Sequence, residues 1–165
     1  MSDKIKPPIQ CTKKEIEAFF QLLKIGSEVE MRSAHEGIMR AKFLAFHYEK
    51  ESLAGIAALK KPTENYKRGI FLKAKTTEQE DNFDLELGYV VTLERYRGFG
   101  ICSTLVRQLI ERSQDSMYAT TRTTNMAMQT VLQQNGFSKA GVPYKGKLQR
   151  VKKADYFLQL FIRNA

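Results

Sequence analysis

The feature of this sequence that most constrains its fold is a candidate strand that leads through a glycine-rich turn into a candidate helix. The run Leu85–Val91 is rich in apolar and aromatic residues, as a buried strand would be. The turn Arg97–Cys102 contains Gly98 and Gly100. Beyond it, apolar residues recur at helical spacing, namely Ile101, Leu105, Val106, Leu109 and Ile110. The segment therefore predicts a strand, a tight turn and an amphipathic helix in direct succession.

A glycine-rich turn that opens a helix is suited to bind an anion. Glycines leave room for the ligand, and the first N–H groups of a helix have no partner within it. Arg97 adds a positive charge beside them. The turn lacks the Lys-Ser/Thr pair of nucleotide-hydrolysing P-loops, and also the third glycine and later acidic residue of dinucleotide-binding folds. A phosphate-bearing ligand of another kind is therefore expected.

The turn resembles the pyrophosphate loop of the GNAT N-acetyltransferases, whose pattern is Arg/Gln-x-x-Gly-x-Gly/Ala. The residues Arg97–Cys102 fit this pattern, except that Cys102 occupies the last Gly/Ala position. The next family element follows in order, as a strand-like run Met117–Thr121, then Asn125, then a helical run Met126–Gln134 before Asn-Gly-Phe. The resemblance implies the GNAT acyl-CoA N-acyltransferase fold, of the α/β (α+β) class. Such a fold has a mixed, mostly antiparallel sheet with a splayed central strand pair and helices on both faces.

The ligand that this resemblance implies is acetyl-CoA, used as a co-substrate without a metal. In the family, the backbone of the strand before the loop pairs with the pantetheine arm and the acetyl carbonyl, while the loop amides hold the pyrophosphate. The residues implied in cofactor binding are Val90, Val91, Thr92, Arg97, Gly98, Phe99, Gly100, Ile101, Cys102, Ser103 and Asn125. Ordinary ladder pairing would also explain the strand residues, and a helix N-cap would by itself explain Asn125.

Glu86 is the candidate catalytic residue. Strand alternation places it on the face shared by Gly88 and Val90. A carboxylate in a partly buried cleft can accept a proton from the acceptor's ammonium group, often through water. Some family members use a strand glutamate at this place as the base. A salt-bridged glutamate, or one at the rim of the cleft, explains the residue equally well.

The family's usual general acid is absent. It is a tyrosine four residues before the glycine of Gly-Phe, and that position holds Leu132. The nearest phenols in the sequence are Tyr118 and Tyr144, and no motif places either of them in the cleft. We therefore expect slow turnover on generic amines, which Leu132→Tyr would accelerate if the new phenol reached the sulfur. Cys102 is interpreted as a small packing residue rather than a nucleophile.

The remaining elements follow from local patterns. Thr12–Glu15 forms a capping-box sequence for a first helix that ends at Gly26. The pattern also predicts a helix Met31–Arg40, an antiparallel hairpin of Phe43–Tyr48 and Leu53–Leu59, a helix or strand at Tyr66–Lys75, a loop at Thr76–Asn82, and two final strands near Ser138–Val142 and Tyr156–Ile162, separated by the basic segment Pro143–Lys153.

Composition sets broader limits. A chain of 165 residues predicts a single domain, residues 1–165, and its net charge of +9 fits a solvated basic surface that also attracts an anionic cofactor. Cys11 and Cys102 form neither a disulfide framework nor a zinc cluster, and His35 and His47 stand in no metal-binding motif. The first residues are too polar for a signal peptide, and no apolar run is long enough to span a membrane. The sequence therefore predicts a cytoplasmic protein.

The predicted function is transfer of acetyl from acetyl-CoA to a primary amine of a small molecule or protein, by direct attack in a ternary complex, in a monomer or homodimer. Leu132 leaves open a non-catalytic acyl-CoA-binding module. The positive charge leaves open an acetyltransferase that acts on a nucleic-acid-linked amine such as aminoacyl-tRNA, although no aromatic-basic motif supports one. The sequence does not identify the acceptor.

Overall fold

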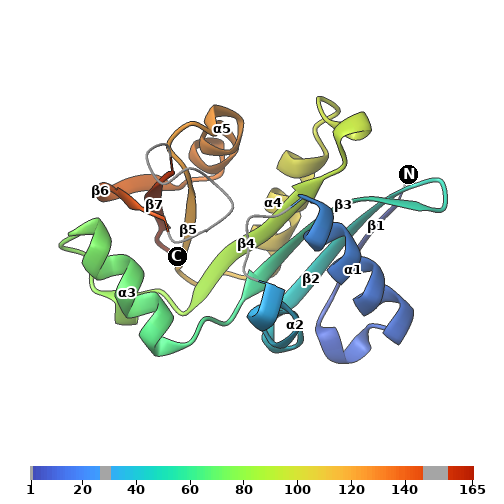
Figure 1. Cartoon of the computed structure of the whole chain (residues 1–165), viewed down its shortest axis with the longest axis horizontal. Helices are drawn as coiled ribbons and strands as arrows, with labels where there is room; N and C mark the ends of the chain where they lie inside the picture. The colour runs from blue at the N-terminus through green and yellow to red at the C-terminus, as the bar shows by residue number, and fades with distance from the viewer. Residues whose placement is uncertain (1, 27–30, 147–155) are drawn as a thin grey trace. The chain divides into compact units, whose positions relative to one another are not determined.

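The computed structural model describes residues 2–26, 31–146 and 156–165 (Figure 1). In this part of the chain, seven strands are hydrogen-bonded in the order β1-β2-β3-β4-β5-β7-β6. The predicted mixed, mostly antiparallel sheet is therefore confirmed. A splayed central strand pair stays a prediction.

The contacts divide the chain into two compact units. Unit 1 comprises Met1–Lys61 and Leu87–Ser113, and unit 2 comprises Pro62–Glu86 and Gln114–Ala165. Strand β4 (Leu85–Thr92) contributes residues to both units. The single domain over residues 1–165 stays a prediction.

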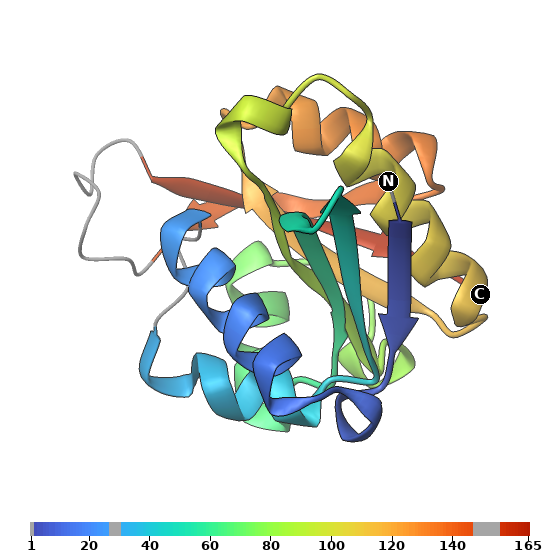
Figure 2. The ribbon, with the colours of Figure 1, turned by 90° about the vertical axis from the view of Figure 1, so that its right-hand side faces the viewer.

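Unit 1 is built from antiparallel strands with helices on two faces. Strand β2 pairs with both β1 and β3, and α1 and α2 lie on the face opposite α4 (Figure 2). Its core includes Phe19 of α1, Ile38 of α2, Phe46 of β2 and Tyr89 of β4. The elements are β1 (Ser2–Lys6), α1 (Lys13–Gly26), α2 (Met31–Arg40), β2 (Phe43–Glu49), β3 (Ser52–Lys60) and α4 (Ile101–Arg112), with short 3-10 helices η1 (Pro8–Gln10) and η3 (Glu94–Tyr96).

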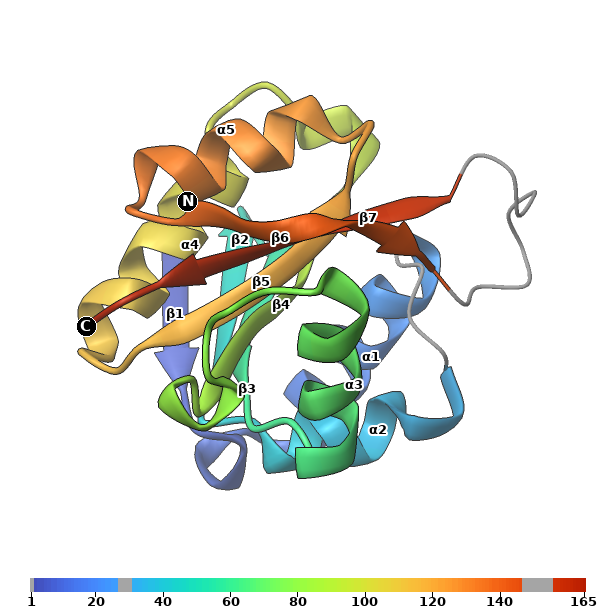
Figure 3. The same ribbon diagram turned by 90° about the vertical axis from the view of Figure 1, so that its left-hand side faces the viewer.

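Unit 2 contains the other strands and two helices. Strand β5 pairs in parallel with β4 at Glu86 and Tyr118 and antiparallel with β7, which in turn pairs with β6 (Figure 3). Phe71 of α3 and Leu160 of β7 belong to its core. The elements are α3 (Glu64–Ala74), η2 (Glu80–Asn82), β5 (Met117–Arg122), α5 (Met126–Gln134), β6 (Ser138–Lys145) and β7 (Phe157–Arg163).

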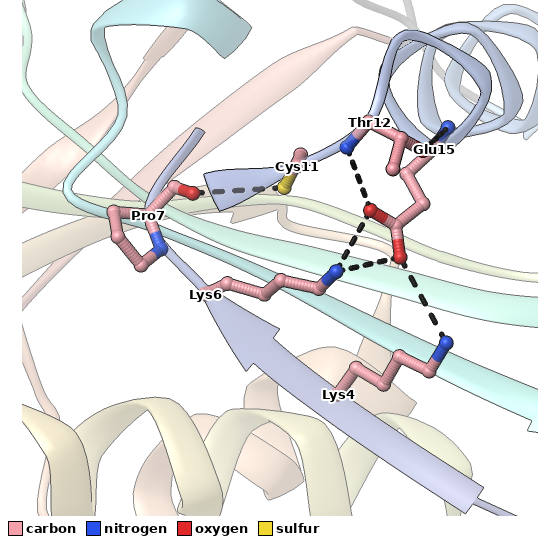
Figure 4. Close-up of polar contacts among 6 residues, drawn as sticks. All are labelled: Lys4, Lys6, Pro7, Cys11, Thr12 and Glu15. Atoms are coloured by element: carbon pink, nitrogen blue, oxygen red, sulfur yellow. Dashed lines mark hydrogen bonds and ion pairs between the residues drawn. The ribbon is translucent and has the colours of Figure 1, made fainter. Parts of the chain in front are cut away.

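The predicted capping box opens α1. The Thr12 N–H donates to Glu15 Oε2 at 2.8 Å, and the Glu15 N–H donates to Thr12 Oγ1 at 3.1 Å. The Lys6 ammonium group also binds the Glu15 carboxylate, at 2.7 and 2.8 Å, and Lys4 Nζ lies 3.8 Å from it (Figure 4). The capping box therefore satisfies N–H groups at the start of α1, and the ion pair between Lys6 and Glu15 joins this helix end to β1.

Two features differ from the sequence interpretation, and the structure decides one alternative that the sequence left open. Strand β1 was not predicted, because its five residues include one apolar side chain and its order comes from pairing with β2. Tyr66–Lys75, left open as a helix or a strand, lies mainly in helix α3. The basic segment Pro143–Lys153 begins inside β6, which extends to Lys145, and residues 147–155 lie outside the described part.

Candidate active site

Strand β4 leads into the candidate site and contains a left-handed residue. Tyr89 has φ 53°, a conformation that costs a bulky side chain roughly 1–2 kcal/mol. A left-handed residue within a strand also interrupts the regular pleat. The simple alternation that placed Glu86 on one face with Val90 therefore does not carry through Tyr89.

The turn after β4 is shaped by its two glycines. Gly98 and Gly100 have φ 84° and 79°, in the region that favours glycine. A Cβ built on either one would meet no heavy atom of the described residues within 4 Å. Arg97 Nε donates to the Thr92 carbonyl at 3.3 Å, which connects the turn to the end of β4. The turn therefore has a fixed backbone with open space beside it.

Helix α4 begins directly at this turn without a side-chain cap from the described residues. Its N-cap is Gly100, and the Thr104 N–H donates to the Gly100 carbonyl at 2.9 Å, which closes the first helical turn. The N–H groups ahead of Thr104 have no acceptor within the helix, and the positive end of the helix dipole lies there. Exposed Phe99 lies between the two glycines. This helix end has the properties of an anion site.

The helix is held in place by the apolar face that its sequence predicted. Its buried residues include Leu105 and Leu109, while Ile110 is half-buried. Gly55 of β3 allows the close approach, since a Cβ there would lie 2.7 Å from Ile101 Cγ2. Packing against β3 thus fixes the position of the glycine turn.

Cys102 lies in the first turn of α4. It is half-buried and forms no disulfide. Burial raises the pKa of its thiol to about 11, so the thiol stays protonated at neutral pH. A protonated thiol is a poor nucleophile, which agrees with the interpretation of Cys102 as a packing residue.

In unit 2, Glu86 lies against two tyrosines. Its side chain is 4% exposed. The Tyr66 hydroxyl of α3 donates to Glu86 Oε1 at 3.4 Å, and the Tyr118 hydroxyl of β5 donates to Oε2 at 3.4 Å. Tyr66 is 48% exposed whereas Tyr118 is fully buried. The carboxylate is thus approached by one phenol from the surface and by one from the core.

The two phenols named from the sequence both belong to this region. Burial, and secondly the charge of Glu86, raises the pKa of Tyr118 and that of Tyr144 above the usual value. Both phenols therefore stay protonated at neutral pH and are weak acids. Tyr118 is a hydrogen-bond donor to Glu86, and its role as an acid toward a leaving thiolate has no support here.

Helix α5 shows the predicted cap at its start and a buried leucine near its end. Asn125 Oδ1 accepts a hydrogen bond from the Met128 N–H at 3.1 Å, so the N-cap explanation is confirmed. Leu132 has no exposed surface. The position where the family usually has a tyrosine is therefore filled by a core side chain.

The structure places the predicted site residues in two groups. Val90–Thr92 and Arg97–Ser103 lie in unit 1, around the end of β4, while Glu86 and Asn125 lie in unit 2. The sequence interpretation missed the contact between Tyr66 and Glu86. A threonine is a common N-cap residue, so Thr63 was a signal in the sequence for the helix that carries Tyr66. In the structure its hydroxyl accepts a hydrogen bond from the Tyr66 N–H at 3.4 Å.

His47, for which the sequence showed no metal-binding motif, is buried and lies between two acidic side chains. His47 Nδ1 lies 2.5 Å from Asp3 Oδ1, and Nε2 lies 2.9 Å from Glu49 Oε1. Among the described residues, no group of histidine, cysteine and acidic side chains is arranged to hold a metal ion. Within the same part of the chain, no helix is both long and apolar enough to cross a bilayer.

Known proteins resemble this chain in sequence and in fold. A profile of the acetyltransferase (GNAT) family matches residues 13–137. No curated protein sequence matches the chain. Among solved structures, ElaA of Escherichia coli superposes with a TM-score of 0.72 at 13% identity, covering 99% of this chain and 100% of that one.

Two similar structures contain coenzyme A or an analogue that includes it. Arabidopsis thaliana Naa50 in complex with the bisubstrate analogue CoA-Ac-MVNAL has a TM-score of 0.70 at 14% identity, with 100% of both chains covered. A Bacillus subtilis acetyltransferase in complex with CoA has a TM-score of 0.65 at 13% identity, covering 99% of this chain and 97% of that one. At these identities the likeness shows the fold, and the family follows from the profile match.

The profile match extends over more than half of the chain and includes both α4 and α5. The chain belongs to the GNAT acetyltransferase family and is an acetyl-CoA-dependent N-acetyltransferase.

Proposed function

We propose that the pyrophosphate of acetyl-CoA binds to the amides of Gly98–Ser103, that its pantetheine arm lies along Val90–Thr92, and that the acetyl group passes directly to a primary amine. One observation carries the proposal. Side chains cap α1, α3 and α5, through Thr12, Thr63 and Asn125, whereas α4 begins at a glycine with no side-chain cap from the described residues. An uncapped N-terminus beside open space is suited to a phosphate.

Two further observations support the fit. Thr92 Oγ1 at the end of β4 is buried and has no hydrogen-bond partner among the described residues, so a polar ligand group beside the strand would satisfy it. Arg97 is exposed, and its Nε is anchored to the Thr92 carbonyl. Its guanidinium still has Nη donors for a phosphate oxygen.

The chemistry supplied by the bound cofactor is an activated acetyl thioester. We propose that backbone N–H groups of Val90–Thr92 polarise the acetyl carbonyl as an oxyanion hole does. Glu86 takes the proton of the attacking amine, directly or through water. The hydroxyls of Tyr66 and Tyr118 donate to this carboxylate and hold it in one orientation.

Among the described residues, those named from the family pattern provide no acid for the leaving thiolate. Leu132 is fully buried and has no proton to give, and both buried phenols are weak acids. We propose that water protonates the thiolate after it leaves. General acid assistance is worth roughly 10²–10⁴-fold, so slow turnover on generic amines is expected.

The cofactor proposal is tested by titrating coenzyme A into Gly100→Asp and Gly100→Asn in a calorimeter. Both residues tolerate a positive φ and have the same size, so they differ mainly in charge. The carboxylate would repel the pyrophosphate, and we expect Gly100→Asp to bind at least about 100-fold more weakly than Gly100→Asn. Equal affinities in folded variants would refute the placement of the pyrophosphate.

The base proposal is tested with Glu86→Gln, which keeps the shape and removes the basicity. With an acceptor found from a panel of amines, kcat should fall at neutral pH and partly recover at higher pH, where the amine loses its own proton. The affinity for coenzyme A should not change. If the pH–rate profile of the variant overlays that of the wild type, Glu86 is structural.

A further inference from the structure

Tyr89 is the one residue of β4 whose backbone is left-handed, with φ 53°. The other two non-glycine residues with positive φ in the described part, Lys50 and Lys75, lie in a hairpin turn and at a helix C-cap. Such a conformation is expected in turns and caps, but in a strand it persists only when the surroundings hold it. The contacts of the Tyr89 side chain therefore matter for the backbone that follows.

The ring of Tyr89 is held from three elements of unit 1. Its hydroxyl lies against Gly37 of α2, so closely that a Cβ at position 37 would overlap Tyr89 Oη. Lys60 Nζ of β3 lies 4.5 Å from the ring centroid, at cation–π distance. The ring of Phe19 in α1 meets it edge-on, with centroids 6.4 Å apart. With 7% exposure, the side chain is fixed in the core.

The strained residue lies directly before the segment assigned to the thioester. Val90–Thr92 follow Tyr89 in β4, and the φ and ψ angles of Tyr89 set the direction of the next peptide group. Relaxation of Tyr89 to an ordinary strand conformation would rotate that peptide plane. Backbone donors aimed at a developing charge depend on such fixed directions.

We propose that Tyr89 is a positioning residue, whose ring, seated on Gly37 and beneath Lys60, holds β4 in the left-handed turn that aims the backbone of Val90–Thr92 at the acetyl-thioester arm. This inference rests on the proposed function, since it assumes that the arm lies along this segment. Gly37 is then required for the space that it leaves to a hydroxyl, rather than for its own backbone conformation.

The geometry provides a compensating pair of substitutions. Gly37→Ala would push the Tyr89 hydroxyl away, whereas Tyr89→Phe removes that hydroxyl. The next ring atom, Cζ, would lie 3.4 Å from the new Cβ, which is an ordinary contact. The double variant should therefore restore the wild-type ring position. Gly69→Ala in α3 is the matched control, since a Cβ there meets none of the described atoms within 4 Å.

Two ligands distinguish an effect on binding of the pantetheine arm from an effect on binding of the pyrophosphate. Acetyl-CoA contacts both the loop and the strand in the proposed complex, while 3′-phospho-ADP, its nucleotide part, contacts the loop alone. We expect Gly37→Ala to weaken acetyl-CoA binding and to lower kcat, each by about tenfold, and to leave the Kd of 3′-phospho-ADP unchanged. The double variant should return both values to within about threefold of the wild type, and Gly69→Ala should change neither.

A merely structural role predicts a different pattern. In that case Gly37→Ala would lower the unfolding midpoint, while kcat per folded molecule and both affinities stay at wild-type values. That result overturns the proposal, as does a loss that Tyr89→Phe fails to rescue, or an equal loss of affinity for both ligands. If Gly37→Ala does not fold, Lys60→Met takes its place, with the same ligand-selective loss expected at about threefold and an unselective or absent loss as refutation.

A failure of the Tyr89 proposal can be told apart from a failure of the proposed function. If the wild-type protein binds neither ligand, or if Gly100→Asp and Gly100→Asn bind coenzyme A equally, the cofactor placement itself is wrong. If the wild type binds both ligands and Gly37→Ala shows no selective effect, the placement stands and the role of Tyr89 is refuted.

Discussion

Helices α4 and α5 both follow a strand, but they differ in how their first N–H groups are satisfied. Helix α4 follows strand β4 through the short 3-10 helix η3 and the glycine turn, and helix α5 follows strand β5 through a short turn. At α5 the Asn125 side chain accepts from the Met128 N–H, so the helix satisfies its own first turn. At α4 the N-cap is Gly100, in the left-handed region, and open space lies beside it.

This difference separates a structural helix end from a binding one. At a capped N-terminus, a side chain of the protein accepts a hydrogen bond from one of the first backbone N–H groups, which stabilises the helix. An uncapped terminus gives up that stability and keeps oriented N–H groups for an anion. Substitutions at α4 should therefore act mainly on ligand affinity, and substitutions at α5 mainly on folding.

Among the side-chain truncations that compare the two helix ends, the largest effect is expected for Arg97→Ala, beside the N-terminus of α4. Removal of a charge-assisted contact to phosphate should weaken coenzyme A by about 1.5–3 kcal/mol, roughly 10–150-fold, with little change in stability. Arg95→Ala is the control, since Arg95 lies two residues away over the Tyr96 ring, 4.9 Å from its centroid. Equal losses in calorimetry would mean that Arg97 acts through general charge alone.

Leu132→Tyr tests the other end of the capped helix. Because Leu132 is fully buried, the larger side chain should overpack the core and lower the free energy of unfolding by about 1–3 kcal/mol. Leu132→Met keeps the volume and should cost less. Denaturant titration measures both. A variant as stable as the wild type with a raised kcat would show instead that position 132 faces the thioester, as the family pattern suggests.

Asn125→Ala should affect folding rather than binding. Loss of the cap at α5 should lower the free energy of unfolding by about 1 kcal/mol, while Asn125→Ser should restore most of it. The affinity for coenzyme A should change less than in Arg97→Ala. A loss of affinity that exceeds the loss of stability would show that Asn125 also contacts the cofactor.

The smallest effect concerns α1, whose start is capped and also paired with Lys6. Burial acts to raise the pKa of Glu15, but the hydrogen bonds from Lys6 and from the Thr12 N–H outweigh it and lower the pKa. A lowered pKa in the folded state gives stability that is present above the unfolded pKa and is lost as pH falls through the folded value. Glu15→Gln should thus cost up to about 1 kcal/mol at pH 7, and less in acid. A pH-independent cost would assign the effect to packing.

Much of the frame followed from local patterns. The capping box at Thr12, the helix Met31–Arg40 and the helix Met126–Gln134 have the bounds or caps that the sequence predicted. These features depend on neighbours within a few residues, so local rules suffice for them. Strand β1 did not follow, because pairing with β2, some forty residues away in the chain, gives it order.

For the site, the sequence by itself determined that a strand, a glycine-rich turn and a helix N-terminus follow one another, since glycine spacing and helical periodicity are local properties. Only the tertiary structure decided that Tyr89 is left-handed against Gly37 and that Tyr66 and Tyr118 donate to Glu86. Those contacts join segments distant in the chain, and packing against a specific neighbour can impose a conformation that no local preference predicts.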